Sequence, residues 1–250
     1  MKKTVAVIGA GISGLSCAQA LKAGGATVRV FEQASSVGGR CATRLWQGHL
    51  VDLGVQYFTA RSPEFKKELL TRLRQFRPII SPILDHESTL VSSPTGPRFY
   101  VLPGNNYLAH ILSSGLDLHL NATVGSLTFG DAGVHCLGET YGAVVSSIPA
   151  PLTARLFSLP GSPVEYEPCL TAMLEYAGTG PFRDCYARLR PESKAPIASS
   201  YCENHKAGRI IGQKTVFVVH ASIHFSRAYA DAPPETYLPH LVKENEELWQ

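Results

Sequence analysis

The hydrophobic residues near the N-terminus predict a strand, a helix and a second strand, in that order. Val5–Ile8 is a continuous apolar run bounded by a glycine, as in a parallel strand covered on both faces. Apolar residues then recur at helical spacing from Ile12 to Leu21, and a Gly-Gly pair follows. Thr27–Phe31 is short and β-branched, which is typical of a strand. The opening segment is therefore predicted to be a βαβ unit and neither a secretory signal nor a membrane span.

Further along, helical and strand patterns alternate and are divided by two proline-rich crossings. Helices are predicted at 63–75, 107–113 and about 235–250, and strands at 116–120, 123–129, 134–137, 143–148, 170–176, 185–189 and 215–221. Prolines cluster at 78–103 and again at 149–168. The predicted fold class is α/β, with a Rossmann-type domain and a second, smaller, mainly antiparallel sheet domain.

Composition narrows the function classes. The chain has 250 residues, 44% of them hydrophobic, and a net charge of +3, which excludes intrinsic disorder. No block of five or six like charges is present, so neither a nucleic-acid partner nor a membrane partner is expected. The six cysteines form no C-x-x-C pair, which predicts no metal site and a reduced, cytoplasmic protein.

A glycine-rich turn joins the first predicted strand to the first helix. Gly9-Ala10-Gly11-Ile12-Ser13-Gly14 is a G-x-G-x-x-G sequence, and Glu32 ends the next predicted strand. The first glycine permits the tight turn, the second lets a pyrophosphate approach the backbone, and the third lets the helix pack on the strand. The helix N-terminus offers N–H groups to phosphates, and Glu32 can bind ribose hydroxyls. This context predicts a dinucleotide site.

Two following segments resemble particular flavoproteins. Gly38-Gly39-Arg40 resembles the second half of the signature of amine-oxidase-type flavoproteins. The segment from Val51 to Arg61 contains Asp52-Leu53-Gly54-Val55-Gln56-Tyr57, which is similar to a D-x-G-x-Q-Y segment of the renalase family. The likeness continues to about residue 245, but only the first 61 residues carry specific motifs.

The resemblance implies FAD as the cofactor, with the FAD-binding domain at 1–75 and 105–150. The substrate or cap domain would be formed by 76–104 and 151–228, followed by a C-terminal helix at 229–250. Renalase-like enzymes transfer a hydride from dihydronicotinamide isomers to flavin, and dioxygen reoxidises the flavin. The predicted cofactor-binding residues are Gly9, Gly11, Ile12, Ser13, Gly14, Glu32, Gln33, Gly39, Arg40, Gly54, Gln56, Tyr57 and Val124. No catalytic residue is assigned; Gln56 and Tyr57 are candidates because they can hydrogen-bond flavin heteroatoms without adding charge.

Two alternatives stay open. A flavin amine oxidase would keep the cofactor and change the small-molecule substrate, whereas an inactive nucleotide-binding fragment would lack the chemistry. The resembling flavoproteins end in a Gly-Asp-containing turn and a helix, which do not follow Gln250, so the sequence is interpreted as truncated or shortened. Apolar surface left exposed in this way would favour a homo-oligomer or another partner. His220 is interpreted as a core histidine and not as a base.

Overall fold

The computed structural model describes residues 4–72, 75–93, 96–161, 164–179, 184–190, 194–210 and 212–250. The chain forms two compact units, each built from two segments. The first unit is Met1–Ala42 with Asn106–Glu165, and the second is Thr43–Asn105 with Tyr166–Gln250. Residues 43–75 thus group with the second unit, although the sequence prediction places them in the nucleotide-binding domain. Compactness alone does not define which residues hold a cofactor, so the predicted domain boundaries stay a prediction.

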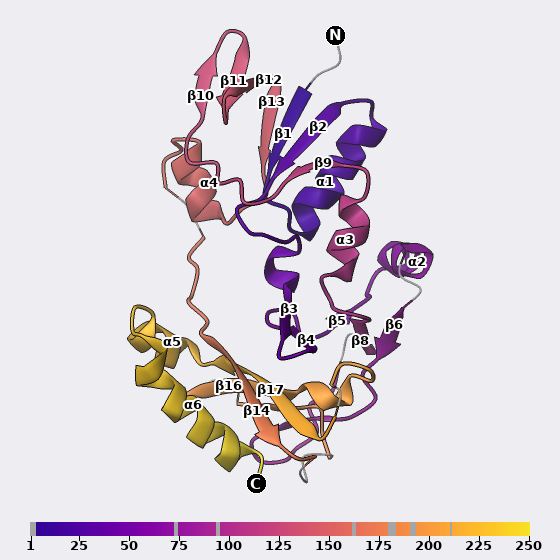
Figure 1. Cartoon of the computed structure of the whole chain (residues 1–250), viewed down its shortest axis with the longest axis vertical. Helices are drawn as coiled ribbons and strands as arrows, with labels where there is room; N and C mark the ends of the chain where they lie inside the picture. Colours follow the sequence, from indigo (N-terminus) through magenta and orange to yellow (C-terminus); the bar gives the residue numbers. More distant parts are fainter. Residues whose placement is uncertain are drawn as a thin grey trace. The chain divides into compact units, whose positions relative to one another are not determined.

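The first unit is built on a parallel sheet of four strands (Figure 1). Its order is β13 (Ala143–Ser146), β1 (Thr4–Ile8), β2 (Thr27–Phe31) and β9 (Asp117–His119), with every neighbouring pair parallel. Helices α1 (Ile12–Ala23) and α3 (Tyr107–Ser113) pack side by side against it. Their apolar residues meet those of the strands in a buried cluster that includes Val7, Leu15, Ala18, Val30 and Leu112. The predicted βαβ unit and the helix at 107–113 are confirmed.

The rest of the first unit departs from prediction in two places. An antiparallel sheet is formed by β10 (Thr128–Gly130), β11 (Gly133–Cys136) and β12 (Glu139–Tyr141). The strand predicted at 123–129 is wrong over most of its length, because residues 122–127 belong to no strand. Helix α4 (Ala150–Leu156) occupies part of the second proline-rich crossing. Proline is tolerated in the first turn of a helix, where its missing N–H is not needed, so these prolines do not exclude one.

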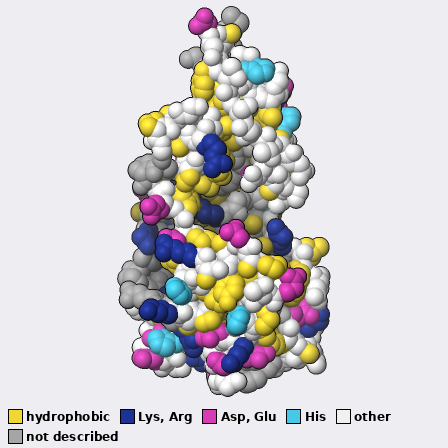
Figure 2. Space-filling view, turned by 90° about the vertical axis from the view of Figure 1, so that its left-hand side faces the viewer, with side chains coloured by type: hydrophobic (Ala, Val, Ile, Leu, Met, Phe, Trp, Pro, Cys, Tyr) yellow, Lys and Arg dark blue, Asp and Glu magenta, His cyan; other side chains and the backbone are white. Residues whose placement is uncertain are grey.

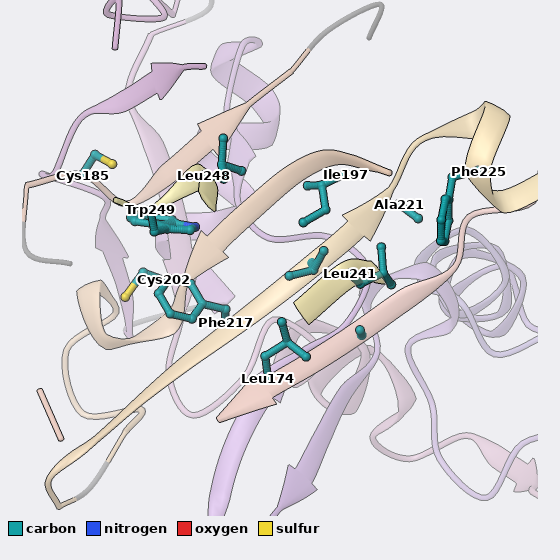
Figure 3. Close-up of a cluster of buried hydrophobic side chains, with 12 residues drawn as sticks. Leu174, Cys185, Ile197, Cys202, Phe217, Ala221, Phe225, Leu241, Leu248 and Trp249 are labelled. Carbon is teal, nitrogen blue, oxygen red and sulfur yellow. The ribbon is translucent and has the colours of Figure 1, made fainter. Parts of the chain in front are cut away.

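A five-stranded sheet forms the core of the second unit. The order is β14 (Thr171–Ala177), β17 (Lys214–Ala221), β16 (Ile197–Cys202), β15 (Ala187–Leu189) and β7 (Ile83–Asp85), antiparallel except for β7 beside β15. Helix α6 (Pro234–Leu248) runs along one face, and α5 (Ile223–Tyr229) precedes it (Figure 1). Figure 3 shows the apolar cluster under α6, in which the rings of Phe217 and Trp249 lie 4.8 Å apart. The mainly antiparallel second sheet and the C-terminal helix are confirmed.

Shorter elements complete the second unit. Strands β3 (Thr43–Trp46) and β4 (His49–Asp52) form a hairpin, and β5 (Phe58–Thr59), β8 (Arg98–Val101) and β6 (Phe76–Pro78) form a small sheet. Helix α2 spans Pro63–Arg72; residues 73 and 74, within the helix predicted at 63–75, lie outside the described residues.

Three further observations concern the surface, the helices and possible metal ligands. Positive and negative side chains are interspersed over the face shown in Figure 2. Among the described residues, no helix combines the length and the apolar character needed to cross a membrane. The described residues also contain no group of three or more His, Cys, Asp or Glu side chains placed to hold a metal ion.

Candidate functional site

Protein packing explains two of the three glycines in the turn between β1 and α1. Gly9 has φ +99°, a conformation that side chains with a Cβ rarely adopt. A Cβ built on Gly14 would lie 2.1 Å from the carbonyl oxygen of Gly9, so α1 could not pack as closely on the strand. These two positions therefore need glycine whether or not a ligand binds.

The second glycine of the turn is different, because no described part of the protein requires it. Gly11 has φ −73° and ψ 173°, which other residues adopt, and a Cβ there would meet no atom within 4 Å. It is the N-cap of α1, and no side chain caps that helix. The described protein thus leaves open space beside a helix N-terminus, whose N–H groups carry partial positive charge. Such an arrangement is suited to binding phosphate groups.

The second glycine motif packs against the first. The N–H of Gly38 donates to the carbonyl of Ala10 over 3.0 Å, and Gly38 has φ +126°. Gly39 has φ +55°, and a Cβ there would lie 3.3 Å from the Cα of Gly11. The side chain of Arg40 is exposed beside this contact. The structure therefore brings together the two glycine motifs that the sequence analysis assigns to one site.

Glu32 holds the turn in place. Its Oε2 accepts a hydrogen bond from the N–H of Ala10, and its Oε1 accepts one from the N–H of Ala34, both over 2.8 Å. An ionised carboxylate has about four lone-pair positions, so capacity remains for ribose hydroxyls. The same side chain can thus shape the loop and bind the ligand.

Other predicted residues of the first unit lie around this loop. The side chains of Ser13 and Gln33 are exposed, and that of Ile12 is half-buried. Val124 is half-buried against the cluster that contains Phe31 and Tyr141. Its segment passes beside Glu32, because the N–H of Ala122 donates to the carbonyl of Glu32 over 2.8 Å.

Predicted residues of the second unit follow strand β4. Gly54 is exposed, whereas Gln56 is 4% exposed. Tyr57 is half-buried against the cluster of Ile83, Tyr186, Ala187 and Tyr201, and the guanidinium of Arg98 lies 5.3 Å from the centre of its ring. The Gln56 side chain is engaged at both ends of its amide: Nε2 donates to the carbonyl of Asp52, and Oε1 accepts from Lys206 over 3.4 Å.

Asp52 is the centre of a buried charge cluster, which also contains Glu203, Lys206 and Arg209. Its Oδ1 accepts from the hydroxyl of Thr43 over 2.6 Å and from the N–H of Asn105 over 2.9 Å. Its Oδ2 accepts from Lys206 over 3.0 Å and from Arg209 over 2.9 Å. All four lone-pair positions of this carboxylate are therefore used. Thr43 and Asn105 are the residues at which the chain enters and leaves the first segment of the second unit.

The other charges of the cluster are nearly or fully buried. Glu203 Oε1 lies 2.6 Å from the ammonium of Lys206, and Glu203 Oε2 lies 3.9 Å from the guanidinium of Arg209. Arg209 also donates to the carbonyls of Val101, over 2.7 Å, and Leu50, over 3.3 Å. Two carboxylates thus face two cations, and the ionised cluster carries no net charge.

The cluster changes how its acids titrate. Burial alone would raise the pKa of Asp52, but the charges of Lys206 and Arg209 outweigh it and hold that pKa below its ordinary value. Burial raises the pKa of Glu203, with a further contribution from the Asp52 charge, despite the nearby cations. Burial also raises the pKa of Tyr186 well above its ordinary value. Its hydroxyl stays protonated and donates to the carbonyl of Gln56 over 3.1 Å.

Sequence reasoning assigned no role to Asp52, Glu203, Lys206 or Arg209. The available signal was the position of Asp52 at the end of the apolar run that begins at Leu50. A charge there needs a partner, but the partners lie more than 150 residues away along the chain. His220 is placed as predicted among packed side chains: its Nε2 lies 2.8 Å from the carbonyl of Leu53, and burial lowers its pKa.

Comparison with known proteins finds matches for the N-terminal part of the chain. Residues 7–73 match the family described as the NAD(P)-binding Rossmann-like domain. A segment of 62 residues is 44% identical to protoporphyrinogen oxidase 2, chloroplastic/mitochondrial, of Arabidopsis thaliana. That segment is 25% of this chain and only 12% of the Arabidopsis protein.

Solved structures resemble the whole chain. An oxidoreductase from Methanosarcina mazei has a TM-score of 0.72 at 14% identity, over 98% of this chain and 84% of that one. Putrescine oxidase bound to putrescine has a TM-score of 0.70 at 14% identity, over 100% and 82%. Reduced UDP-galactopyranose mutase has a TM-score of 0.71 at 11% identity, over 88% and 75%. These likenesses establish the α/β fold, with a Rossmann-like parallel sheet and antiparallel sheets.

Proposed function

We propose that this protein binds FAD and is a flavin-dependent oxidoreductase. The observation that carries the proposal is Gly11, whose missing side chain leaves space at a helix N-terminus that the protein itself does not fill. Two findings support it: the likeness of one segment to a protoporphyrinogen oxidase, and the fold shared with an oxidoreductase and with putrescine oxidase. A turn that served packing alone would need glycine at Gly9 and Gly14 but not at Gly11.

Each residue of the loop has a separate part in binding. The backbone N–H groups at the start of α1 bind the diphosphate, and Gly11 lets it come close. Glu32 accepts hydrogen bonds from ribose, and its negative charge disfavours a 2′-phosphate. The exposed Arg40 adds a positive charge for the phosphates. Gln56 and Tyr57 stay the predicted neighbours of the flavin ring, and Val124 and Gly54 stay predicted contacts.

The renalase resemblance supplies the proposed reaction. The donor would be a small reduced molecule, for which a dihydronicotinamide isomer is the proposed case, and it would be oxidised by loss of a hydride. Bound FAD supplies the acceptor for that hydride, and dioxygen takes the two electrons with two protons to give hydrogen peroxide. Because no proton is removed from carbon as such, the reaction needs no general base at His220.

Cofactor content tests the proposal. The purified protein is expected to be yellow, or to become yellow with added FAD, and Gly11→Val is expected to remove FAD without unfolding the protein. Gly130→Val is the matched control, because Gly130 also has open space around its Cβ and ordinary φ but lies in strand β10. Folded protein that takes up no FAD, or Gly11→Val protein with unchanged FAD affinity, would contradict the proposal.

The donor is tested separately, once FAD binding is established. Oxygen consumption is measured with dihydronicotinamide isomers and, in parallel, with primary amines. The proposal expects turnover of the former, with one hydrogen peroxide formed for each donor oxidised. Turnover of amines alone would favour a flavin amine oxidase, and flavin binding without turnover of either would favour an inactive nucleotide-binding protein.

A further inference from the structure

The buried charge cluster includes a lysine that the proposed reaction does not use. Lys206 is completely buried, and its ammonium has three hydrogens to donate. Three acceptors surround it: Glu203 Oε1 at 2.6 Å, Asp52 Oδ2 at 3.0 Å and Gln56 Oε1 at 3.4 Å. Two of these acceptors are carboxylates that balance its charge. The third is neutral, and charge balance alone does not require it.

The partners of Gln56 fix which way its amide points. Lys206 can only donate, so it must face the amide oxygen, and the carbonyl of Asp52 can only accept, so it must face Nε2. Reversing the amide would place donor against donor and acceptor against acceptor. The amide therefore has one orientation, and it keeps one N–H and one lone pair for a ligand.

The backbone of the same residue is held as firmly as its side chain. The carbonyl of Gln56 accepts from the hydroxyl of Tyr186 over 3.1 Å and from the amide of Asn105 over 3.3 Å. The amide of Asn105 also donates to the carbonyl of Val55 over 2.8 Å. A side chain held on a fixed backbone can present its remaining polar atoms at defined positions.

We propose that Lys206 is a positioning residue, which fixes the orientation of the side-chain amide of Gln56, a predicted contact of the flavin ring. The proposal rests on the proposed function, because that function supplies the flavin. Lys206 is completely buried against Asp52, Glu203 and Gln56, so it acts through Gln56 and is not a catalytic residue. Its other role, balancing the charges of Asp52 and Glu203, can be removed separately.

Two variants separate positioning from charge balance. Lys206→Met removes the donor to Gln56 and leaves the buried cluster with an excess negative charge. The double variant Lys206→Met/Glu203→Gln also lacks the donor, but it pairs Asp52 with Arg209 and restores neutrality. Lys214→Met is the control, because Lys214 forms an ion pair with Glu175 over 2.6 Å in the same unit and does not contact Gln56.

Hydrogen exchange of the Gln56 side-chain amide is the readout, measured by NMR and assigned by comparison with Gln56→Glu. Urea unfolding of the same samples gives their stability. The double variant is expected to recover most of the urea midpoint that Lys206→Met loses, while its Gln56 amide still exchanges about tenfold faster than in the unmodified protein. Lys214→Met is expected to leave this exchange unchanged. Exchange that recovers together with stability, or that never changes, would overturn the positioning role.

The same samples separate this proposal from the proposed function. Failure of the unmodified protein to bind FAD would refute the proposed function, whereas Gln56 exchange would still report on the amide. Where FAD binds, the double variant is expected to shift the visible absorption maxima of the bound flavin, and Lys214→Met is not. Unshifted maxima with a mobile Gln56 amide would show that its orientation does not serve the flavin.

Discussion

The two units differ in how far their polar groups are paired within the protein. The loop between β1 and α1 uses glycine to leave backbone N–H groups and space unfilled around Gly11. The buried charge cluster uses every acceptor position of Asp52 within the protein, and Lys206 donates to both Asp52 and Gln56. A binding site needs hydrogen-bond donors and acceptors that the protein leaves unpaired, because the ligand supplies their partners. A positioning site needs hydrogen-bonding groups that are paired within the protein, because its geometry must not change when the ligand binds.

This difference predicts how each region responds to substitution. Changes in the cluster should lower the stability of the folded protein whether or not a ligand is present, because they leave buried groups unpaired. Changes at the open part of the loop should alter ligand affinity and leave the free protein nearly unaffected.

The largest effect is expected at Asp52. Asp52→Asn keeps the size of the side chain but removes a buried negative charge, leaving Lys206 and Arg209 to share one carboxylate. We expect the free energy of unfolding to fall by about 3–5 kcal/mol, as when one partner of a buried ion pair is removed. Urea unfolding at neutral pH measures it.

An exposed carboxylate gives the control for this prediction. Asp117 pairs with Arg29 over 2.8 Å, but half of its side chain is exposed. Asp117→Asn should cost no more than about 1 kcal/mol, because solvent screens surface pairs. Equal losses for the two variants would show that burial of the cluster does not contribute as argued.

The glycines of the loop give the next effect. Gly14→Ala places a Cβ 2.1 Å from the backbone oxygen of Gly9, so the strand and α1 must move apart. We expect a loss of about 1–3 kcal/mol in the free energy of unfolding, as for an overpacked core. Gly11→Ala should change it by less than about 1 kcal/mol, because the added Cβ meets no described atom and only the N-cap preference changes. Thermal unfolding without added FAD compares them.

The same contrast explains what the sequence could predict. The strand, turn and helix of residues 4–23 were predictable because each signal is local: an apolar run, a glycine spacing and a helical period within one stretch of chain. The family resemblance assigned both glycine motifs to the cofactor site, but their direct contact was not predicted. Strand β16 was missed because its sequence, Ile-Ala-Ser-Ser-Tyr-Cys, lacks the β-branched alternation that marks strands, and its serines are buried by long-range packing.

The cluster could not be predicted for a related reason. Asp52 lies 154 residues before Lys206 and 157 before Arg209, and nothing local links these positions. Only the five-stranded sheet brings them together, since η2 (Glu203–His205), a 3₁₀ turn that follows β16, and the residues after it carry the partner charges. In the sequence, the charged residues after β16 look like those of an ordinary exposed loop.

Replacement of Glu32 tests whether the loop between β1 and α1 binds the ligand. Glu32→Ala removes the acceptor of the Ala10 N–H and the proposed acceptor for ribose. We expect the Kd for FAD to rise by the equivalent of about 1–3 kcal/mol, with a smaller change in stability because the site is partly exposed to water. Asp131→Ala is the control, since Asp131 is an exposed carboxylate between β10 and β11 and is not among the predicted cofactor-binding residues. Flavin fluorescence titration measures both, and equal Kd values would argue against the ribose role.

The smallest effect concerns pH and His220, on the sheet of the second unit. Burial lowers the pKa of His220, and the nearby Lys206 charge contributes, although the hydrogen bond to Leu53 opposes them. A histidine with a lowered folded-state pKa stabilises the protein fully above its unfolded pKa of about 6.5, and that contribution is lost as pH falls through the folded pKa. We expect a slope of at most about 1.4 kcal/mol per pH unit below pH ~6.5. His220→Gln should remove that slope while its amide still donates to Leu53. An identical pH dependence in the two proteins would show that the buried His220 does not contribute to stability as its lowered pKa predicts.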